Sequence, residues 1–328
     1  MGKGATSKAL EQQLEELNRL RATPEAPEAR AAIVRALESA RAPLVEAAAN
    51  IVANAELDGF EPALRDAFGR FVQQPAKSDP RCIAKTSTVR ALYKLSARAF
   101  DVFLRGIRYV QSEPAWRGSH DTAAELRGLS ALGLVRGGYP DMAVELAELL
   151  ADREPMARLA AVQAIAYSER CDFGLPLLRF KARVGDEEPK VTAACFSGLL
   201  ALAPHGSLSF IESFLASDDE GTREAALLAL GESRLPDALS VLRRVVQEPL
   251  SSEFRATALM AIALMRTDGA WNYLLEVVRE EGPARARQAL DALATYRREP
   301  SLRERMLSAV AARADDELQK HADQALSI

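Results

Sequence analysis

The chain has 328 residues, of which 48% are hydrophobic and only 6% are aromatic. Ala and Leu dominate the hydrophobic set, and this balance is typical of closely packed helices rather than of sheets rich in β-branched and aromatic side chains. The 42 basic and 46 acidic residues give a formal net charge of -4, which excludes the overall basic excess of a general nucleic-acid binder.

The sequence also argues against a membrane span and against secretion. Its longest apolar stretches are interrupted by charges before about 18 residues, the length that a spanning helix needs. Residues 1–7 lack the apolar core of a signal peptide, and Cys82, Cys171 and Cys195 lie far apart without a C-x-x-C pair. We therefore expect a cytoplasmic protein with reduced cysteines.

The first predicted element is an amphipathic helix within residues 8–21, where Leu10, Leu14, Leu17 and Leu20 recur at helical spacing. A proline-containing run then breaks the pattern, so residues 1–26 are assigned to this helix and its linker. We interpret the helix as a cap over the first repeat, because the end of a repeat array must be covered. A docking or dimerisation helix is the alternative.

The main feature of the chain is a pattern that occurs seven times. A small residue is followed by a large apolar one, and the pair returns three residues later, with 31 to 37 residues between copies. This spacing places all four side chains on one helical stripe, and the small ones allow a neighbouring helix to approach closely. The copies begin at Ala91, Gly128, Ala161, Cys195, Ala226, Ala258 and Ala289.

A second apolar stripe follows each copy, for example at Leu242 and at Leu274, and Gly- or Pro-containing turns separate the two. Each unit is therefore predicted to be two helices. One such pair cannot bury its apolar face alone, so the pairs must stack. We predict an all-α, right-handed α-solenoid of about seven to eight stacked antiparallel helix pairs, with divergent repeats at 27–121, regular repeats at 122–313 and a capping helix at 314–328.

The segment from Thr222 to Gly231, followed by residues 235–246, resembles a HEAT-like repeat of the short type first associated with phycobilisome lyase subunits. The resemblance implies a HEAT-like superhelix with the first helix of each pair on the convex side and the second lining the concave side. Arg158, Arg223 and Arg255 match an Arg that often opens the first helix in this family. Other residues stand in that place in the remaining repeats, namely Glu125, Thr192 and Ala286.

The most informative departure from the period lies at residues 97–121. A mostly basic stripe occupies one face of a predicted second helix, and we expect that face to line the groove. It leads into a loop, 111–121, that holds one of only two Trp residues. From Arg65 to Arg136 the chain has 13 basic and 6 acidic residues, a local balance of +7. The candidate partner-binding residues are Arg98, Asp101, Arg105, Arg108, Tyr109, Trp116, Arg117 and His120.

Two interpretations of this stripe remain open. Long Arg stems can simply cover apolar surface while a Trp anchors the loop. Alternatively, the stripe and the Trp form an anion-attracting patch with an aromatic anchor, suited to an acidic or phosphate-bearing protein partner.

Catalytic and cofactor motifs are not found. The three His residues, His120, His205 and His321, are scattered, and no P-loop or G-x-G-x-x-G motif is present. Cys195 occupies the small position of a core stripe, and Cys82 has basic neighbours that could lower a thiol pKa but no identifiable base. We expect no metal, no cofactor and no enzymatic activity.

The sequence therefore favours a non-catalytic scaffold or adaptor that binds a protein partner in a concave groove, with the oligomeric state open. The first alternative is DNA binding or repair in the manner of the HEAT-like glycosylases, but a continuous track of basic residues for phosphates is missing, so nucleic acid is not the expected partner. The second alternative, a lyase-type chaperone for a chromophore protein, comes only from the resemblance.

Overall fold

A computed structural model describes residues 2–116, 118–249 and 251–327. These residues form nineteen α-helices, three short 3-10 helices and a single two-stranded sheet, which confirms the predicted all-α solenoid. The chain divides into two compact units, Met1–Gly174 and Leu175–Ile328, and each is described separately. None of the described helices is both long and apolar enough to cross a membrane.

The first unit contains six helices before the region of regular repeats, then the start of that region. The helices are α1 (Gly2–Leu20), α2 (Pro27–Leu37), α3 (Ala42–Ala55), α4 (Glu61–Gln73), α5 (Ile83–Lys94), α6 (Phe100–Ile107), α7 (Ala124–Gly137), α8 (Met142–Leu149) and α9 (Pro155–Tyr167). Two 3-10 turns, η1 (Ala76–Ser78) and η2 (Pro80–Cys82), connect α4 to α5. The helix α10 (Cys171–Val184) crosses the division between the units.

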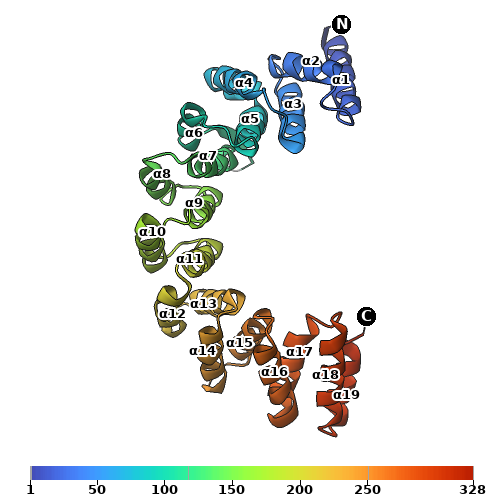
Figure 1. Ribbon diagram of the computed structural model, residues 1–328, viewed down its shortest axis with the longest axis vertical. Helices are drawn as coiled ribbons and strands as arrows, with labels where there is room; N and C mark the ends of the chain where they lie inside the picture. The colour runs from blue at the N-terminus through green and yellow to red at the C-terminus, as the bar shows by residue number, and fades with distance from the viewer. Residues whose placement is uncertain (1, 117, 250, 328) are drawn as a thin grey trace. The chain divides into compact units, whose positions relative to one another are not determined.

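Helices of the first unit pack in two layers. Within one layer α3 packs on α5, α5 on α7 and α7 on α9, while α4 packs on α6 in the other (Figure 1). The first layer lies on the inner side of the curve of this unit, and the layer of α4, α6 and α8 lies on its outer side (Figure 1). We call them the inner and the outer layer.

This arrangement corrects the expectation that the second helix of each pair lines the concave side. The stripes of small residues lie on the helices of the inner layer, which approach each other closely: a Cβ on Gly128 of α7 would stand 2.6 Å from the Cβ of Ala160 on α9. The outer layer carries large side chains such as Phe68 and Phe103, which are fully buried. The layer with the smaller spacing between its helices must lie inside the curve.

The second unit repeats the same arrangement. Its helices are α11 (Pro189–Leu202), α12 (Pro204–Glu212), α13 (Glu220–Ser233), α14 (Pro236–Gln247), α15 (Ser252–Leu264), α16 (Asp268–Glu280), α17 (Pro283–Ala294), α18 (Pro300–Ala311) and α19 (Asp316–Ala325), with η3 (Ser213–Ala216) after α12. Within it α11 packs on α13, α13 on α15 and α15 on α17. All seven predicted stripes fall on α5, α7, α9, α11, α13, α15 and α17.

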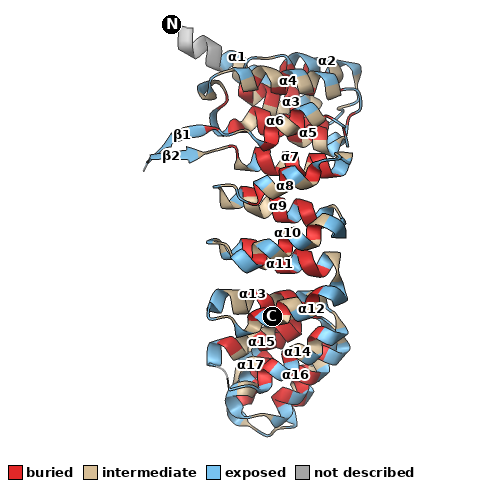
Figure 2. Ribbon diagram, turned by 90° about the vertical axis from the view of Figure 1, so that its left-hand side faces the viewer, coloured by how far each residue is buried: buried red, intermediate tan, exposed pale blue. Residues whose placement is uncertain are grey.

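Most of the predicted stripe residues lie in the core. Leu227 and Leu259 are fully buried, as are the small residues Ala226 and Ala258 beside them. Buried side chains gather on the helix faces that meet other helices (Figure 2). Burial of apolar surface between successive pairs therefore holds each unit together.

The helices near the two ends of the chain cover the ends of the stacks. Leu17 of α1 is buried, and α1 packs on α2 and α3. Leu318 and Ala322 of α19 are buried against α17 and α18. In chain order the described helices α3 to α18 make eight pairs, in line with the predicted seven to eight, and α1 and α2 precede them.

Residues 111–121 were expected to form a loop, but most of them form a β-hairpin. Strand β1 (Ser112–Ala115) pairs antiparallel with β2 (Gly118–Asp121), and Ala115 faces Gly118 next to the turn. Gly118 has a φ of +95°, which a tight turn requires and a residue with a Cβ rarely adopts. The hairpin projects from the edge of the first unit (Figure 2).

Candidate functional site

The predicted basic stripe lies on the outer layer of the first unit, around α6. Asp101 and Arg105 lie on α6, whereas Arg98 precedes the helix and Arg108 follows it. The expectation that this stripe lines a groove is therefore wrong, because α6 belongs to the layer on the outer side of the curve (Figure 1).

Most of the stripe interacts with neighbouring helices. Asp101 pairs with Arg65 of α4, and Arg108 pairs with Glu145 of α8. The Arg105 guanidinium lies 5.7 Å from the ring centroid of Phe68 on α4. These side chains fasten α6 to the helices on either side, so their positive charge is largely matched or shielded. Arg98 stays exposed in the turn between α5 and α6.

The remaining candidates belong to the hairpin or lie just before it. Trp116 stands at the tip with 98% of its side chain exposed. His120 is also exposed, and Tyr109 is half-buried at the base. Arg117 lies outside the described residues. The structure thus separates the predicted site into an outer-layer cluster around α6 and a projecting hairpin.

The base of the hairpin is fastened to the connection between α4 and α5. The Gln111 side-chain amide donates a hydrogen bond to the backbone carbonyl of Asp79 at 2.8 Å. The Glu113 carboxylate accepts three hydrogen bonds, from the backbone N–H of Arg81 at 2.7 Å, from the Gln111 amide at 2.6 Å and from the Thr122 hydroxyl at 3.0 Å.

Beneath this base lies a fully buried ion pair. The Lys85 Nζ is 2.7 Å from Asp79 Oδ2, and neither side chain is exposed. Asp79 Oδ1 also accepts the backbone N–H of Ala84 at 2.9 Å, so the carboxylate stabilises the first turn of α5. Lys85 Nζ lies 5.2 Å from the centroid of the Tyr109 ring.

A second polar cluster fastens the other strand to the next two repeats. Arg127 of α7 is buried, and its Nη1 donates to Asp121 Oδ2 of β2 at 2.7 Å and to the backbone carbonyl of Tyr109 at 2.9 Å. Its Nη2 donates to Asp152 Oδ1, in the connection between α8 and α9, at 2.9 Å. Paired guanidinium and carboxylate groups of this geometry resist distortion.

The environment shifts the pKa of both hairpin carboxylates downward. Burial acts to raise the pKa of Glu113, but hydrogen bonds from Gln111, Thr122 and the backbone of Arg81 outweigh it. Burial likewise opposes ionisation of Asp121, and the N–H groups of Ala123 and Gln111 together with Arg127 hold its pKa below the ordinary value. Both carboxylates therefore stay ionised at neutral pH, which keeps the base of the hairpin intact.

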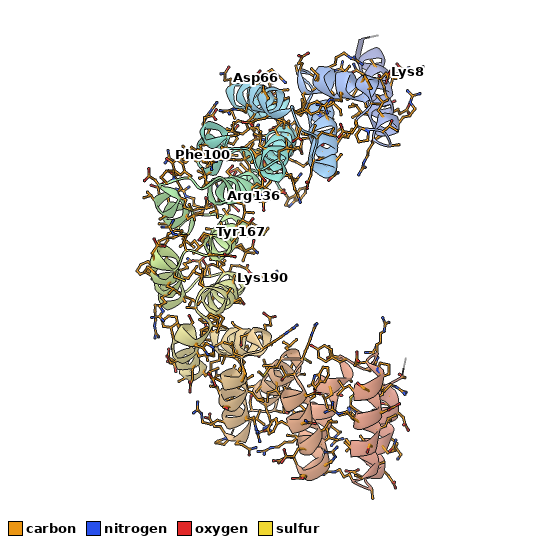
Figure 3. The ribbon with its side chains drawn as sticks, in the orientation of Figure 1. Lys8, Asp66, Phe100, Arg136, Tyr167 and Lys190 are labelled. Carbon is orange, nitrogen blue, oxygen red and sulfur yellow. The ribbon has the colours of Figure 1, made fainter. Side chains whose placement is uncertain are left out.

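The inner layer presents a different surface. Leu129, Leu132 and Arg136 of α7 share one helical face, and Met156 and Tyr167 of α9 share another. Figure 3 shows Arg136 and Tyr167 on the inner side of their helices. The two leucines are half-buried, while Met156 is 64% and Tyr167 51% exposed.

Cations border this apolar strip. The Arg136 guanidinium lies 5.1 Å from the ring centroid of Tyr93 on α5, and Lys94 follows Tyr93 at the end of that helix. Among the described residues, no carboxylate forms an ion pair with Lys94 or Arg136. These two cations therefore remain without a carboxylate partner, unlike Arg108 of the outer layer.

Two of the three cysteines, Cys82 and Cys195, are buried. Burial raises the pKa of Cys82 to about 12, so its basic neighbours do not make it a thiolate. Cys195 is buried in the core as predicted, and burial raises its pKa to about 12. Within the described part of the chain, no group of three or more His, Cys, Asp or Glu side chains could hold a metal ion.

Sequence reasoning missed both polar clusters beneath the hairpin. Asp79, Lys85 and Arg127 are separated by up to 48 positions, and each resembles an ordinary solvated charge when read alone. One local signal was available. Lys85 and the three residues after it are polar although they belong to the helix of the stripe that begins at Ala91, and Lys85 to Thr88 are all buried.

Comparison with known proteins agrees with the repeat architecture. Residues 177–263, from α10 into α15, match the family described as HEAT repeats. No curated protein matches the chain. A crystal structure described as an engineered protein, from the Northeast Structural Genomics Consortium, is 15% identical, with a TM-score of 0.35, over 96% of this chain and 98% of that one. Likeness at that level carries no functional argument.

Proposed function

We propose that this protein is a repeat scaffold that binds an acidic segment of a partner protein along the inner layer of its first unit. The observation that carries the proposal is the strip of partly exposed apolar side chains on α7 and α9, bordered by cations that lack carboxylate partners. HEAT repeats generally serve as such scaffolds, and the match over residues 177–263 supports this class of function.

The chemistry of the strip defines the partner. Leu129, Leu132 and Met156 offer apolar contact to an amphipathic segment, and Tyr167 adds a large aromatic surface of the kind enriched at interfaces. Lys94 and Arg136, at the ends of α5 and α7, favour carboxylate or phosphate groups at one end of that segment. Affinity therefore comes from apolar burial, and orientation comes from charge.

Charge reversal on the inner layer tests the proposal. The double variant K94E/R136E should weaken capture of partner proteins about tenfold, because it replaces two attractions with two repulsions. Quantitative pull-down from the native cell provides the measurement, and the wild-type interaction should weaken as salt increases.

Arg105→Glu is the control, because it also replaces a cation by a carboxylate in the same unit but lies on the outer layer. Its binding should equal that of the wild type. Equal capture by K94E/R136E and wild type would refute the proposal. A loss of capture by Arg105→Glu alone would indicate that the binding surface lies on the outer layer.

A further inference from the structure

We infer that the β1–β2 hairpin is a binding finger and that Trp116 at its tip inserts into an apolar pocket of a partner protein. The indole is 98% exposed and makes no contribution to the core. Its neighbours on the hairpin are small or polar, so the apolar surface is concentrated in one side chain. Trp is the residue most enriched among those that dominate binding energy at protein interfaces.

The base of the finger is held in place before the finger binds. An isolated two-stranded hairpin is marginally stable in water, but this one is held at both strands. Glu113 fastens β1 to the connection before α5, and Asp121 fastens β2 to Arg127 of α7. The buried side chains of Lys85 and Arg127 support this base from below. Such support lowers the entropy lost when Trp116 is immobilised by a partner.

The hairpin is poorly suited to the addition of a partner strand. Pro114 occupies β1 and has no backbone N–H to donate, so a continuous ladder cannot form along that edge. Each strand has only four residues, which further limits the number of ladder hydrogen bonds. Side-chain insertion therefore fits the hairpin better than strand pairing.

Charge argues against a membrane surface as the target. Residues 112–121 carry Glu113 and Asp121 against the single Arg117, a balance of -1. Anionic lipid surfaces attract clusters of basic residues, and a stable anchor needs more than one apolar contact. A protein pocket that encloses a single indole requires neither a cluster of basic residues nor a second apolar contact.

This inference is independent of the proposed function. The hairpin projects from the edge of the first unit, whereas the acidic segment would lie along the inner layer (Figures 1 and 2). Variants distinguish the two surfaces: Trp116→Ala changes only the hairpin, and K94E/R136E changes only the inner layer.

The experiment first identifies partner proteins by affinity capture and then measures binding between this protein and one purified partner. Tagged wild type, Trp116→Ala and the hairpin control His120→Ala are used to recover proteins from the native cell. A protein that Trp116→Ala loses is then purified and titrated against a Trp271→Phe variant, in which Trp116 is the only remaining indole. Trp271→Phe keeps an aromatic ring opposite Tyr296.

Binding should shift the emission of Trp116 to shorter wavelength and protect it from acrylamide quenching, because the indole leaves water. Trp116→Ala should weaken the purified pair at least about tenfold, while His120→Ala should not. The melting temperature of Trp116→Ala should equal that of the wild type, since the removed side chain contacts solvent.

Three results would overturn the inference. One is that wild type and Trp116→Ala recover the same proteins, or that wild type recovers no protein at all. A second is an emission shift produced by vesicles of phosphatidylcholine, with or without phosphatidylserine, which would make the target a lipid surface. The third is a shift that appears when the Trp271→Phe variant alone is concentrated, which would make the target a second copy of the chain.

Discussion

Lys85 carries its charge into a site where neither it nor Asp79 is exposed, in a helix that also buries the polar side chains from Thr86 to Thr88. Removing an ammonium group and a carboxylate from water costs several kcal/mol each, and only close pairing with further hydrogen bonds offsets that cost. Here the carboxylate also accepts two backbone N–H groups of α5, from Ala84 and Lys85. The pair therefore fixes the start of α5 against the hairpin base.

Removal of one charge of this pair should be much worse than removal of both. Lys85→Met should destabilise the protein by about 3 kcal/mol or more, because it leaves Asp79 charged and buried. Chemical denaturation provides the measurement, and Lys77→Met, at an exposed lysine, is the matched control. In a double-mutant cycle with Asp79→Asn, the double variant should lose less than the sum of the singles. If the losses of the two single variants added up to that of the double variant within about 0.5 kcal/mol, Lys85 and Asp79 would not be coupled.

Single residues differed in how well the sequence predicted them. Leu227 and Cys195 were correctly placed in the core, because a repeated pattern averages over seven copies and tolerates local exceptions. Asp79 and Lys85 have no counterparts in the other repeats. Their burial depends on a hairpin about 30 residues further along the chain. No local pattern carries that information, so the polar clusters emerged only from the structure.

Between elements, the helices α13 and α15 of the second unit approach each other very closely at Gly231. A Cβ placed on Gly231 would lie 2.1 Å from the backbone carbonyl oxygen of Ala261. Backbone atoms cannot move aside as a side chain does, so only glycine permits this helix spacing. Gly231, which directly follows the predicted stripe, thus sets the distance between α13 and α15.

Gly231→Ala should therefore destabilise the second unit by about 3 kcal/mol, at the upper end of the cost of overpacking. Thermal and chemical unfolding provide the measurement. Gly269→Ala is the matched control, because its Cβ would meet only Leu239 at an ordinary 3.6 Å and would favour the helix. If Gly231→Ala were as stable as Gly269→Ala, the close approach would not be the factor that spaces these helices.

The sequence predicted where the helices lie along the chain far better than it predicted which layer each helix belongs to. Amphipathic stripes and Gly- or Pro-containing turns indicated the helices, because both signals act within a few residues. Which helix of a pair lies inside the curve depends on the relative spacing of two layers. The resemblance to a known repeat gave the wrong side, and this error misplaced the basic stripe of Arg105 and Arg108 in the groove. The hairpin was missed because its strands lack apolar alternation.

At the scale of the whole molecule, each repeat contacts mainly its neighbours in sequence, so stability is a sum of local terms. A helix without a neighbour on one side exposes its apolar face to water. The helix α19 prevents this for α17 and α18, through Leu318 and Ala322 and through a 2.6 Å contact from His321 Nε2 to Asp291 of α17.

Leu318→Asp should therefore act on one part of the chain only. The change places a charge in a buried apolar contact and should detach α19, at a cost of about 3 kcal/mol or more. Hydrogen exchange should become faster in α17, α18 and α19 and stay unchanged in the first unit, because the repeats there lose no neighbour. Gln324→Asp, at an exposed position of the same helix, should leave exchange as in the wild type. Equal loss of protection in both units would mean that the chain unfolds as one cooperative body rather than as a stack of locally stabilised repeats.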